Sequence, residues 1–287
     1  MLIGSERIDL GLTLIDSAQC FRWTQKGDSF GAVVDRNAIW LTETPDGVNA
    51  EGGTYTFLRD YLDLNRDYVK IAREYAHIPI VRSAIETYPG LRVMNQPTWE
   101  TLVSFILSAN NNVSRIRKLC HALQTALGER FDTPRGPLYA MPDPEIIANC
   151  SEESLRKLGV GYRAPYLIQT ARRVADGFPL AELSDMEYAE AHEKLVELPG
   201  VGDKVADCVL LFGCRHSEAL PVDVWMARLI ADWLGESEAN RARLARRARE
   251  ILGKNAGIAQ QFLFHAARMG EMSQDVYAES LLAADHR

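Results

Sequence analysis

Lys204 stands where a side-chain amine could become a nucleophile. It follows the glycine-rich turn of the segment LPGVGDK, residues 198–204. We expect one helix to end at Leu198 and a second to begin near Asp203, with Lys204 in its first turn. A cation there opposes the helix dipole, and the same positive helix end favours the neutral amine, which is the form that attacks. A lysine placed against this local rule is a candidate nucleophile.

The turn before Lys204 could bind an anion. Gly200 and Gly202 permit backbone torsions closed to other residues and remove side chains that would block a close approach. Backbone N–H groups at the start of the second helix, including that of Val205, would then suit a DNA phosphate. The pattern predicts a helix-hairpin-helix that binds DNA backbone without reading sequence. Pro-Gly-x-Gly alone also fits an ordinary turn between helices with a glycine cap.

Asp223 is the second candidate for chemistry. It precedes the apolar stretch VWMARLI, residues 224–230, and is predicted to be the N-cap of a helix. The structural role and a catalytic role are compatible, because a capping carboxylate is held rigidly and can still face a cleft.

Composition indicates an ordinary globular protein. The 287 residues are 47% hydrophobic and 25% charged, enough for one large domain or two smaller ones. No stretch is long and apolar enough to cross a bilayer, and the first residues do not resemble a signal peptide, so we expect a cytoplasmic protein without a membrane partner. Five scattered cysteines without CxxC spacing argue against a zinc site, an iron–sulfur cluster or a disulfide framework.

The net charge and its distribution give opposite indications about a nucleic-acid partner. The net charge of −7 taken alone opposes phosphate binding. Against this, five arginines and Lys254 crowd residues 241–254. The simplest interpretation of that run is a solvated helix face.

The elements that must position these residues change type along the chain. Apolar residues alternate at Ile8-Leu10-Leu12, at Phe30-Ala32-Val34 and at Ala38-Trp40, with turn residues at 26–28, 35–37 and 45–47, so we expect an antiparallel sheet of hairpins. From about Tyr55 the periodicity is helical.

Helix boundaries follow from capping residues further along. We expect Thr98 to cap a helix that ends near residues 110–112, Asp143-Pro144 to open another, and a third to run from about 163 to 177. Ser184 and Glu187 have the spacing of a capping box. The predicted fold class is α+β: a small antiparallel β-rich N-terminal domain, residues 1–90, followed by a mostly α-helical core, residues 91–287, with the active site in its cleft.

Several segments together resemble one family. LPGVGxK followed by Pro221-Val222-Asp223 closely resembles the helix-hairpin-helix DNA glycosylases, and within them the 8-oxoguanine DNA glycosylase/AP lyases. SAQCFRW at 17–23, SANNNVSRI at 108–116, LGVGYRA at 158–164, and Ala259-Gln260 with Phe264 are similar to further motifs of that family. The resemblance spans nearly the whole chain in the family's order.

The resemblance implies a reaction that needs no metal or cofactor. Lys204 would attack C1′ of the damaged nucleotide, displace the base and form a Schiff base, after which the 3′ phosphate would be eliminated. Asp223 would stabilise positive charge on the sugar. The implied partner is double-stranded DNA with 8-oxoguanine opposite cytosine, bound by a monomer without an obligate protein partner.

The resemblance also implies roles around the extruded base. Phe264 and Cys208 would sandwich the base, and Gln260 would hydrogen-bond its edge. The gap in the duplex or the orphaned cytosine would be contacted by Asn110, Arg115, Tyr162 and Arg163. Extrusion requires such contacts because unstacking a base costs a few kcal/mol.

Three departures from the family pattern bear on substrate choice. Ala18 replaces a glycine whose carbonyl is expected to receive the N7–H of 8-oxoguanine. Phe212 replaces a smaller residue beside the pocket, and Trp225 stands where animal members have a histidine near a phosphate. A related glycosylase for another oxidised or alkylated base, and a lesion-binding protein that does not cut, therefore stay open, as does, more remotely, a helical interaction module.

Overall fold

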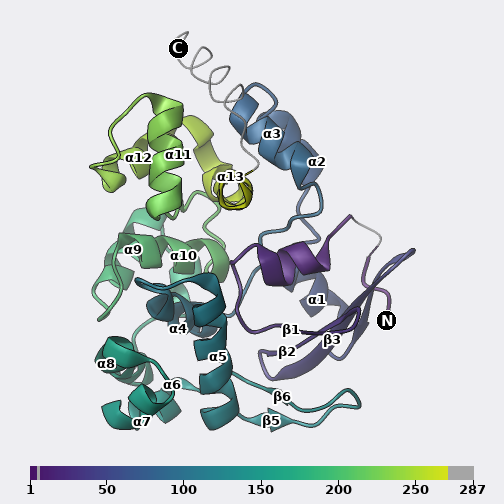
Figure 1. Ribbon diagram of the computed structural model, residues 1–287, viewed down its shortest axis with the longest axis vertical. Helices are drawn as coiled ribbons and strands as arrows, with labels where there is room; N and C mark the ends of the chain where they lie inside the picture. The colour runs from purple at the N-terminus through teal and green to yellow at the C-terminus, as the bar shows by residue number, and fades with distance from the viewer. Residues whose placement is uncertain (5–6, 271–287) are drawn as a thin grey trace.

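The computed structural model describes residues 1–4 and 7–270; the end of the predicted second domain, residues 271–287, lies outside the described residues, as do residues 5–6. A four-stranded sheet lies on one side of the molecule and most of the helices lie on the other (Figure 1). The predicted α+β class, with a β-rich N-terminal part before a helical core, is confirmed.

The sheet is a meander of antiparallel hairpins in the order β1-β2-β3-β4. Its strands are β1 (Thr24–Lys26), β2 (Ser29–Val34), β3 (Asn37–Thr44) and β4 (Gly47–Glu51). The strands expected at residues 30–34 and 38–42 and all three turns are confirmed, although burial does not alternate along β2, where residues 30–34 are all buried. Gly31 pairs with Trp40, and a Cβ on Gly31 would lie 2.7 Å from the indole ring, so this glycine makes room for the tryptophan.

The strand expected at residues 8–12 is wrong. Residues Gly11–Asp16 form a short π-helix, η1, closed by a hydrogen bond from Ser17 N to Leu12 O. The Asp9 carboxylate accepts a hydrogen bond from Leu12 N at 2.8 Å and so starts the turn. Leu10 and Leu14, four residues apart, are both buried in the core beneath the sheet, which is a helical spacing that the alternating pattern concealed.

Three helices follow the sheet. They are α1 (Tyr55–Tyr61), α2 (Tyr68–Glu74) and α3 (Pro79–Thr87). Helix α1 packs under the sheet through Leu58 and Tyr61. Helices α2 and α3 belong to the larger core, where the Tyr75 hydroxyl donates to Leu252 O at 2.7 Å. A division of the chain at residue 90 stays a prediction.

The remaining helices form the larger core. They are α4 (Thr98–Ser108), α5 (Val113–Leu127), α6 (Pro144–Ala148), α7 (Glu152–Lys157), α8 (Ala164–Ala175), α9 (Tyr188–Val196), α10 (Asp203–Gly213), α11 (Val224–Leu234), α12 (Arg241–Leu252) and α13 (Ala256–Met269). Short 3-10 turns lie at Gly161–Arg163, Glu182–Ser184 and Gly253–Asn255. A small hairpin, β5 (Arg130–Phe131) and β6 (Leu138–Tyr139), follows α5 and packs on β2. No helix of the described residues is long and apolar enough to cross a membrane.

Two predicted caps are wrong, one at a tertiary contact and one at a local 3-10 turn. Pro97, not Thr98, is the N-cap of α4, and the Thr98 hydroxyl instead donates to Gly213 O at the end of α10. Ser184 lies in a 3-10 turn and donates to Ala181 O, so Glu187 becomes the N-cap of α9. Asp143 does precede α6 with proline at its first position, as expected, without a side-chain cap bond.

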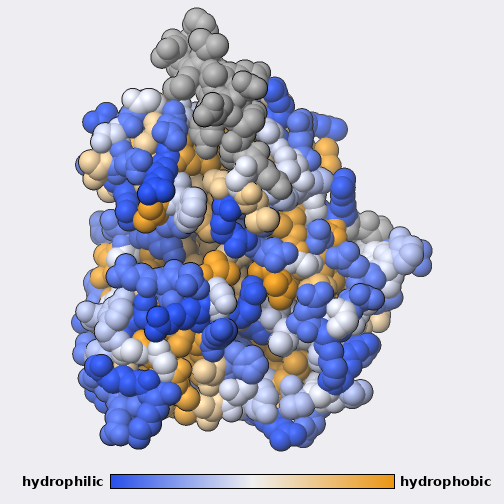
Figure 2. All heavy atoms as spheres, in the orientation of Figure 1, coloured by the Kyte–Doolittle hydropathy of each residue, from blue (hydrophilic) through white to orange (hydrophobic). Residues whose placement is uncertain are grey.

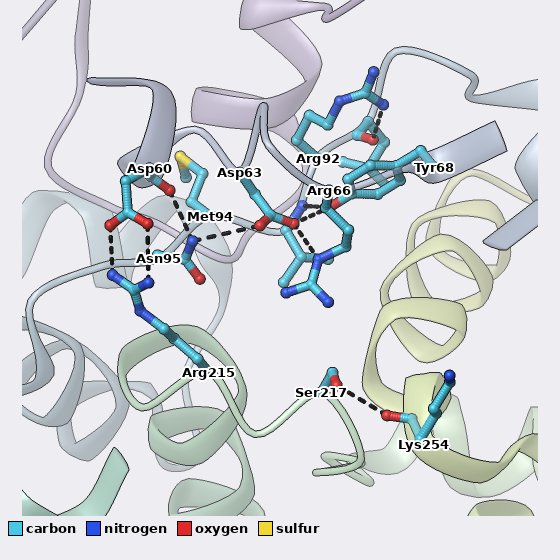
Figure 3. Close-up of polar contacts among 12 residues, drawn as sticks. Asp60, Asp63, Arg66, Tyr68, Arg92, Met94, Asn95, Arg215, Ser217 and Lys254 are labelled. Atoms are coloured by element: carbon cyan, nitrogen blue, oxygen red, sulfur yellow. Dashed lines mark hydrogen bonds and ion pairs between the residues drawn. The ribbon is translucent and has the colours of Figure 1, made fainter. Parts of the chain in front are cut away.

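Polar contacts fix the N-terminal part to the helical core. Figure 3 shows Arg215, which follows α10, paired with Asp60 of α1 at 2.9 Å, and Asn95 donating to Asp60 O at 2.7 Å. Asp63 is buried and accepts from Arg66 and Tyr68. These bonds matter for the site because residues on both sides of this junction line one cavity.

Candidate active site

A cavity of about 940 Å³ is lined by residues from both parts of the chain. The N-terminal part supplies Ala18 and Phe21, and the rest comes from the end of α4, the loop into α5, and α10 to α13. Figure 2 shows apolar side chains gathered in the middle of this face, between the α11–α12 and α4–α5 helices. Eleven of the fourteen residues proposed for the site line this cavity: Ala18, Asn110, Gly200, Gly202, Lys204, Val205, Cys208, Phe212, Asp223, Gln260 and Phe264.

Lys204 lies in the first turn of α10, as predicted. Its Nζ donates to the Ser108 hydroxyl at 3.1 Å and lies 4.9 Å from the centroid of the Phe105 ring. Both partners come from the last turn of α4. The amine is therefore held by a neutral acceptor and an aromatic face, and no carboxylate within the described residues forms an ion pair with it.

The hairpin before Lys204 adopts the expected turn. Gly200 has φ +81°, and a Cβ there would lie 2.8 Å from Tyr166 Cβ, so only glycine fits without displacing the tyrosine. Gly202 is the N-cap of α10 and has no side chain to bond the first N–H groups of that helix. Those groups border the cavity at Gly202, Lys204 and Val205. The phosphate site predicted there stays a prediction that this geometry permits.

Asp223 is the N-cap of α11, as the sequence predicts. One carboxylate oxygen, Oδ1, accepts a hydrogen bond from Met226 N at 2.9 Å. The cap fixes the side chain, while the residue also lines the cavity that contains Lys204. The nucleophile candidate and its carboxylate partner thus reach one space from the starts of two different helices.

Aromatic rings form one wall of the cavity. Phe212 stacks on Phe105 with centroids 5.5 Å apart, and Phe21 meets Phe105 edge-on at 5.8 Å. Cys208, one turn after Lys204, is buried, and burial raises the pKa of its thiol to about 12. The thiol is therefore neutral at physiological pH and serves as a packing surface. Phe264 is half-buried and faces the same space.

Gln260 offers an unused acceptor. Its Nε2 donates to Pro221 O at 3.2 Å, which orients the amide. Its Oε1 is buried and has no hydrogen-bond partner among the described residues. A buried acceptor without a partner costs roughly 1–3 kcal/mol, so a ligand with N–H donors would find this atom ready.

Ala18 occupies a backbone conformation that favours glycine. Its φ is +59°, whereas its counterpart in the family pattern is glycine. The residues on either side hold the turn: Gln261 Nε2 donates to Ser17 O at 2.7 Å, and Gln19 Nε2 donates to Arg92 O at 2.7 Å. The strained turn is thus fixed by buried amides, and Ala18 faces the cavity.

Three predicted DNA-contact residues lie outside the cavity lining. Arg163 is buried, and its Nε donates to Ala109 O at 2.9 Å. The Tyr162 hydroxyl donates to the same carbonyl at 3.2 Å and accepts from Asn110 at 3.3 Å. These contacts order the loop that carries Asn110, which has φ +48°. Arg115 is exposed in the first turn of α5. Their contacts with DNA stay predictions.

Several lining residues escaped the sequence analysis. Phe21 and Ser108 lie within the motifs SAQCFRW and SANNNVSRI but were given no role, and Phe105 has no local pattern that separates it from core residues. Asp207 could have been found, because it lies three residues after Lys204 and so shares its helix face. It accepts a hydrogen bond from Tyr188 at 2.7 Å, and burial raises its pKa to about 6. Trp225, singled out as a departure, is half exposed at the cavity.

Comparison with known proteins gives matches over most of the chain. Residues 103–254 match the sequence profile of the HhH-GPD superfamily of base excision DNA repair proteins. Residues 1–102 match that of the 8-oxoguanine DNA glycosylase N-terminal domain. An N-glycosylase/DNA lyase of Saccharomyces cerevisiae is 39% identical over 153 residues, which is 49% of this chain and 41% of the yeast protein.

Longer matches extend the comparison. The N-glycosylase/DNA lyase OGG1 of Arabidopsis thaliana is 34% identical over 273 residues, which is 87% of this chain and 75% of the plant protein. The solved structure of the Clostridium acetobutylicum 8-oxoguanine glycosylase/lyase, bound to DNA with cytosine opposite 8-oxoguanine, is 27% identical with a TM-score of 0.88. That match covers 93% of this chain and 94% of the clostridial chain.

The two family matches meet at residue 102, within α4, so that together they take in the sheet, the Ala18 turn, the hairpin and both catalytic candidates. Less than half of the yeast relative's length is spanned, but three quarters of the plant relative's length is. The chain belongs to the HhH-GPD superfamily of base excision DNA repair proteins, in its 8-oxoguanine DNA glycosylase branch.

Proposed function

We propose that the protein is a bifunctional DNA glycosylase and AP lyase that excises 8-oxoguanine opposite cytosine from duplex DNA. The observation that carries this is the convergence of Lys204 and Asp223 on one cavity of about 940 Å³, within the roughly 300–1,000 Å³ typical of ligand pockets. The clostridial relative, whose complex holds this lesion pair, supports the substrate.

Lys204 performs the covalent step. Its neutral amine attacks C1′ of the extruded nucleotide, the glycosidic bond breaks, and the base leaves with the bonding electron pair and takes up a proton. Loss of a proton from nitrogen and opening of the sugar ring give the Schiff base. Removal of a C2′ proton then expels the 3′ phosphate. The Ser108 hydroxyl and the Phe105 ring position the amine in the cavity.

Asp223 stabilises the transition state electrostatically. Positive charge develops on the sugar as the base departs, and a fixed carboxylate stabilises it without needing to reorganise. The N-cap bond to Met226 supplies that fixation. The raised thiol pKa of Cys208 keeps this neighbouring sulfur protonated, so that it does not compete as a nucleophile.

The cavity suits an oxidised purine. The Watson–Crick edge of a guanine-type base carries N–H donors, which the unpaired Gln260 Oε1 can accept. Phe264 and Cys208 provide flat or apolar surfaces for its faces. The Ala18 carbonyl is assigned to the N7–H that 8-oxoguanine has and guanine lacks. Asn110, Arg115, Tyr162 and Arg163 are assigned to the gap and the orphaned cytosine.

Borohydride trapping tests the proposal. The protein is incubated with a duplex carrying 8-oxoguanine opposite cytosine, and borohydride reduces any Schiff base to a stable adduct. Wild type is compared with Lys204→Gln and with Lys118→Gln, a matched control on the exposed face of α5 outside the cavity. We expect adducts with wild type and Lys118→Gln, and none with Lys204→Gln.

Other lesions in the same duplex separate the alternatives. An adduct that forms only with another damaged base would keep the chemistry and overturn the substrate. Binding to the lesion without an adduct or strand cleavage would indicate a non-cutting binder and remove the role given to Lys204.

A further inference from the structure

Helix α12 is strongly basic within an acidic chain. Its sequence RARLARRAREIL contains five arginines and one glutamate, although the net charge of the protein is −7. Figure 1 places α12 beside α11, in the upper part of the molecule near α9. The arginines are not equivalent, because the helix turns about 100° per residue and presents them on different faces.

One face is neutralised by the protein itself. Arg243 pairs with Glu236 at 3.1 Å. Arg247, one turn later, pairs with Glu236 at 3.6 Å and with Glu250 at 3.3 Å. This part of the basic run therefore fits the simple interpretation of a solvated, ion-paired helix face.

The face of α12 toward the cavity has different contacts from the ion-paired face. Arg241 lines the cavity together with Ala242 and Ala245. Further along, Arg249 reaches Asp207 of α10 at 3.8 Å and rests on the Tyr188 ring. Arg246 is exposed and lies at the edge of this face, about 40° around the helix from Ala242 and about 60° from Arg243.

Arg241 is distinctive among the cations that line the cavity. Lys204 donates to Ser108, and the Arg268 guanidinium donates to Asp16 O. For the Arg241 side chain, the described residues provide neither an ion pair nor a hydrogen bond. The lining of the same cavity includes Asp203, Asp207 and Asp223, whose carboxylates would repel an approaching phosphate unless a cation offset them.

We propose that Arg241 and the neighbouring Arg246 bind backbone phosphates of the lesion-bearing strand beside the mouth of the cavity. The inference rests on the proposed function, since a nucleotide extruded into the cavity brings its flanking phosphates to the rim. Arginine suits this task because its planar fork donates paired hydrogen bonds to phosphate oxygens. The binding surface thereby extends from the hairpin of α9 and α10 onto α12.

Salt-dependent binding tests the proposal. The probe is a duplex carrying a tetrahydrofuran abasic-site analogue, which cannot be excised, and Kd is measured by fluorescence anisotropy from 50 to 200 mM salt. Each phosphate contact contributes about 0.9 to the slope of log K against log salt. We expect Arg241→Gln to lower the slope by about 1, and Arg241→Gln with Arg246→Gln to lower it by about 2.

Arg243→Gln is the matched control, with the same charge change two residues away on the ion-paired face. Its slope should equal that of wild type. Equal slopes for wild type and Arg241→Gln, or equal losses for Arg241→Gln and Arg243→Gln, would overturn the phosphate site. Absence of binding by wild type would instead overturn the proposed function. Thermal unfolding of each variant checks that the fold is intact, since both residues are exposed.

Discussion

A buried ion pair joins the N-terminal segment to the helical core and offers a sharp test of the structure. Arg22 lies in the SAQCFRW segment and Glu100 in the first turn of α4, and both are less than a tenth exposed. Burial raises the pKa of Glu100 despite the attraction of Arg22. The pair is therefore costly to bury, and more costly to break on one side only.

Glu100→Gln should be the most damaging change, because it leaves a guanidinium that cannot lose its proton. Breaking a buried pair in this way costs about 3–5 kcal/mol. At roughly 2 cal/mol/K of unfolding entropy per residue, a loss of about 4 kcal/mol lowers the Tm of a 287-residue chain by about 7 °C. Arg22→Met should cost less, since the remaining carboxyl can bind a proton, and this variant should gain stability as pH falls.

Urea denaturation followed by circular dichroism at pH 5 and pH 7.5 gives the unfolding free energies of wild type, both single variants and the double variant. Arg22→Met with Glu100→Gln should be more stable than Glu100→Gln alone, because no unpaired charge is left. If the double variant instead lost the sum of the two single losses, the side chains would not be coupled and the reasoning would be refuted.

Three further predictions concern the site and its supports. Burial raises the pKa of Asp207 from its ordinary 3.8 to about 6, so the folded state binds a proton more tightly, and the unfolding free energy of wild type should fall by up to roughly 3 kcal/mol as pH rises from about 4 to 6. The unfolding free energy of Asp207→Asn, measured across this range, should lack that fall, and the same pH dependence in both proteins would contradict the role given to burial. Asp223→Asn should retain the cap on α11 and near-wild-type Tm while losing base excision, whereas Asp223→Ala should also lose about 1 kcal/mol of unfolding free energy; excision by Asp223→Asn at the wild-type rate would remove the charge role. Gly257→Ala should lower Tm by several degrees, because the added Cβ would overlap Ala219 O and lie 2.5 Å from Leu211 Cδ1. An unchanged Tm would show that α13 can move away from these two residues without loss of stability.

Local patterns predicted most of the elements, and they failed where distant contacts decide. The hairpin at residues 29–44 follows from alternation and turn residues, which are local properties. The cap expected at Thr98 failed because its hydroxyl bonds Gly213, more than a hundred residues away. No local rule foresees that partner, although the helix it begins was predicted.

The site residues that could be predicted are those that lie at the beginnings of helices. Lys204 and Asp223 each occupy the beginning of a helix, and such positions can be read from glycines, prolines and capping residues. Their convergence on one cavity could not be predicted from the sequence, because it depends on how α10 and α11 pack. Phe105, whose ring the amine contacts, lies on a helix whose residues from Glu100 to Ser108 are all buried, so the sequence does not distinguish it from ordinary core residues.

The Ala18 turn shows how the rest of the chain determines the shape of the site. An alanine at φ +59° is disfavoured by roughly 1–2 kcal/mol relative to an ordinary conformation, so local preference alone would not select this turn. Gln19 Nε2 donates to Arg92 O and shares its second hydrogen between Thr13 O and Ser17 Oγ, and Gln19 Oε1 accepts from Met94 N. Gln261 reaches across from α13 and donates to Ser17 O. Releasing the turn would leave these buried amides without partners, at a cost larger than the strain. The position of the Ala18 carbonyl, on which recognition of the base is proposed to depend, is thus fixed in part by Gln261, which lies 244 positions from its partner Ser17 in the chain.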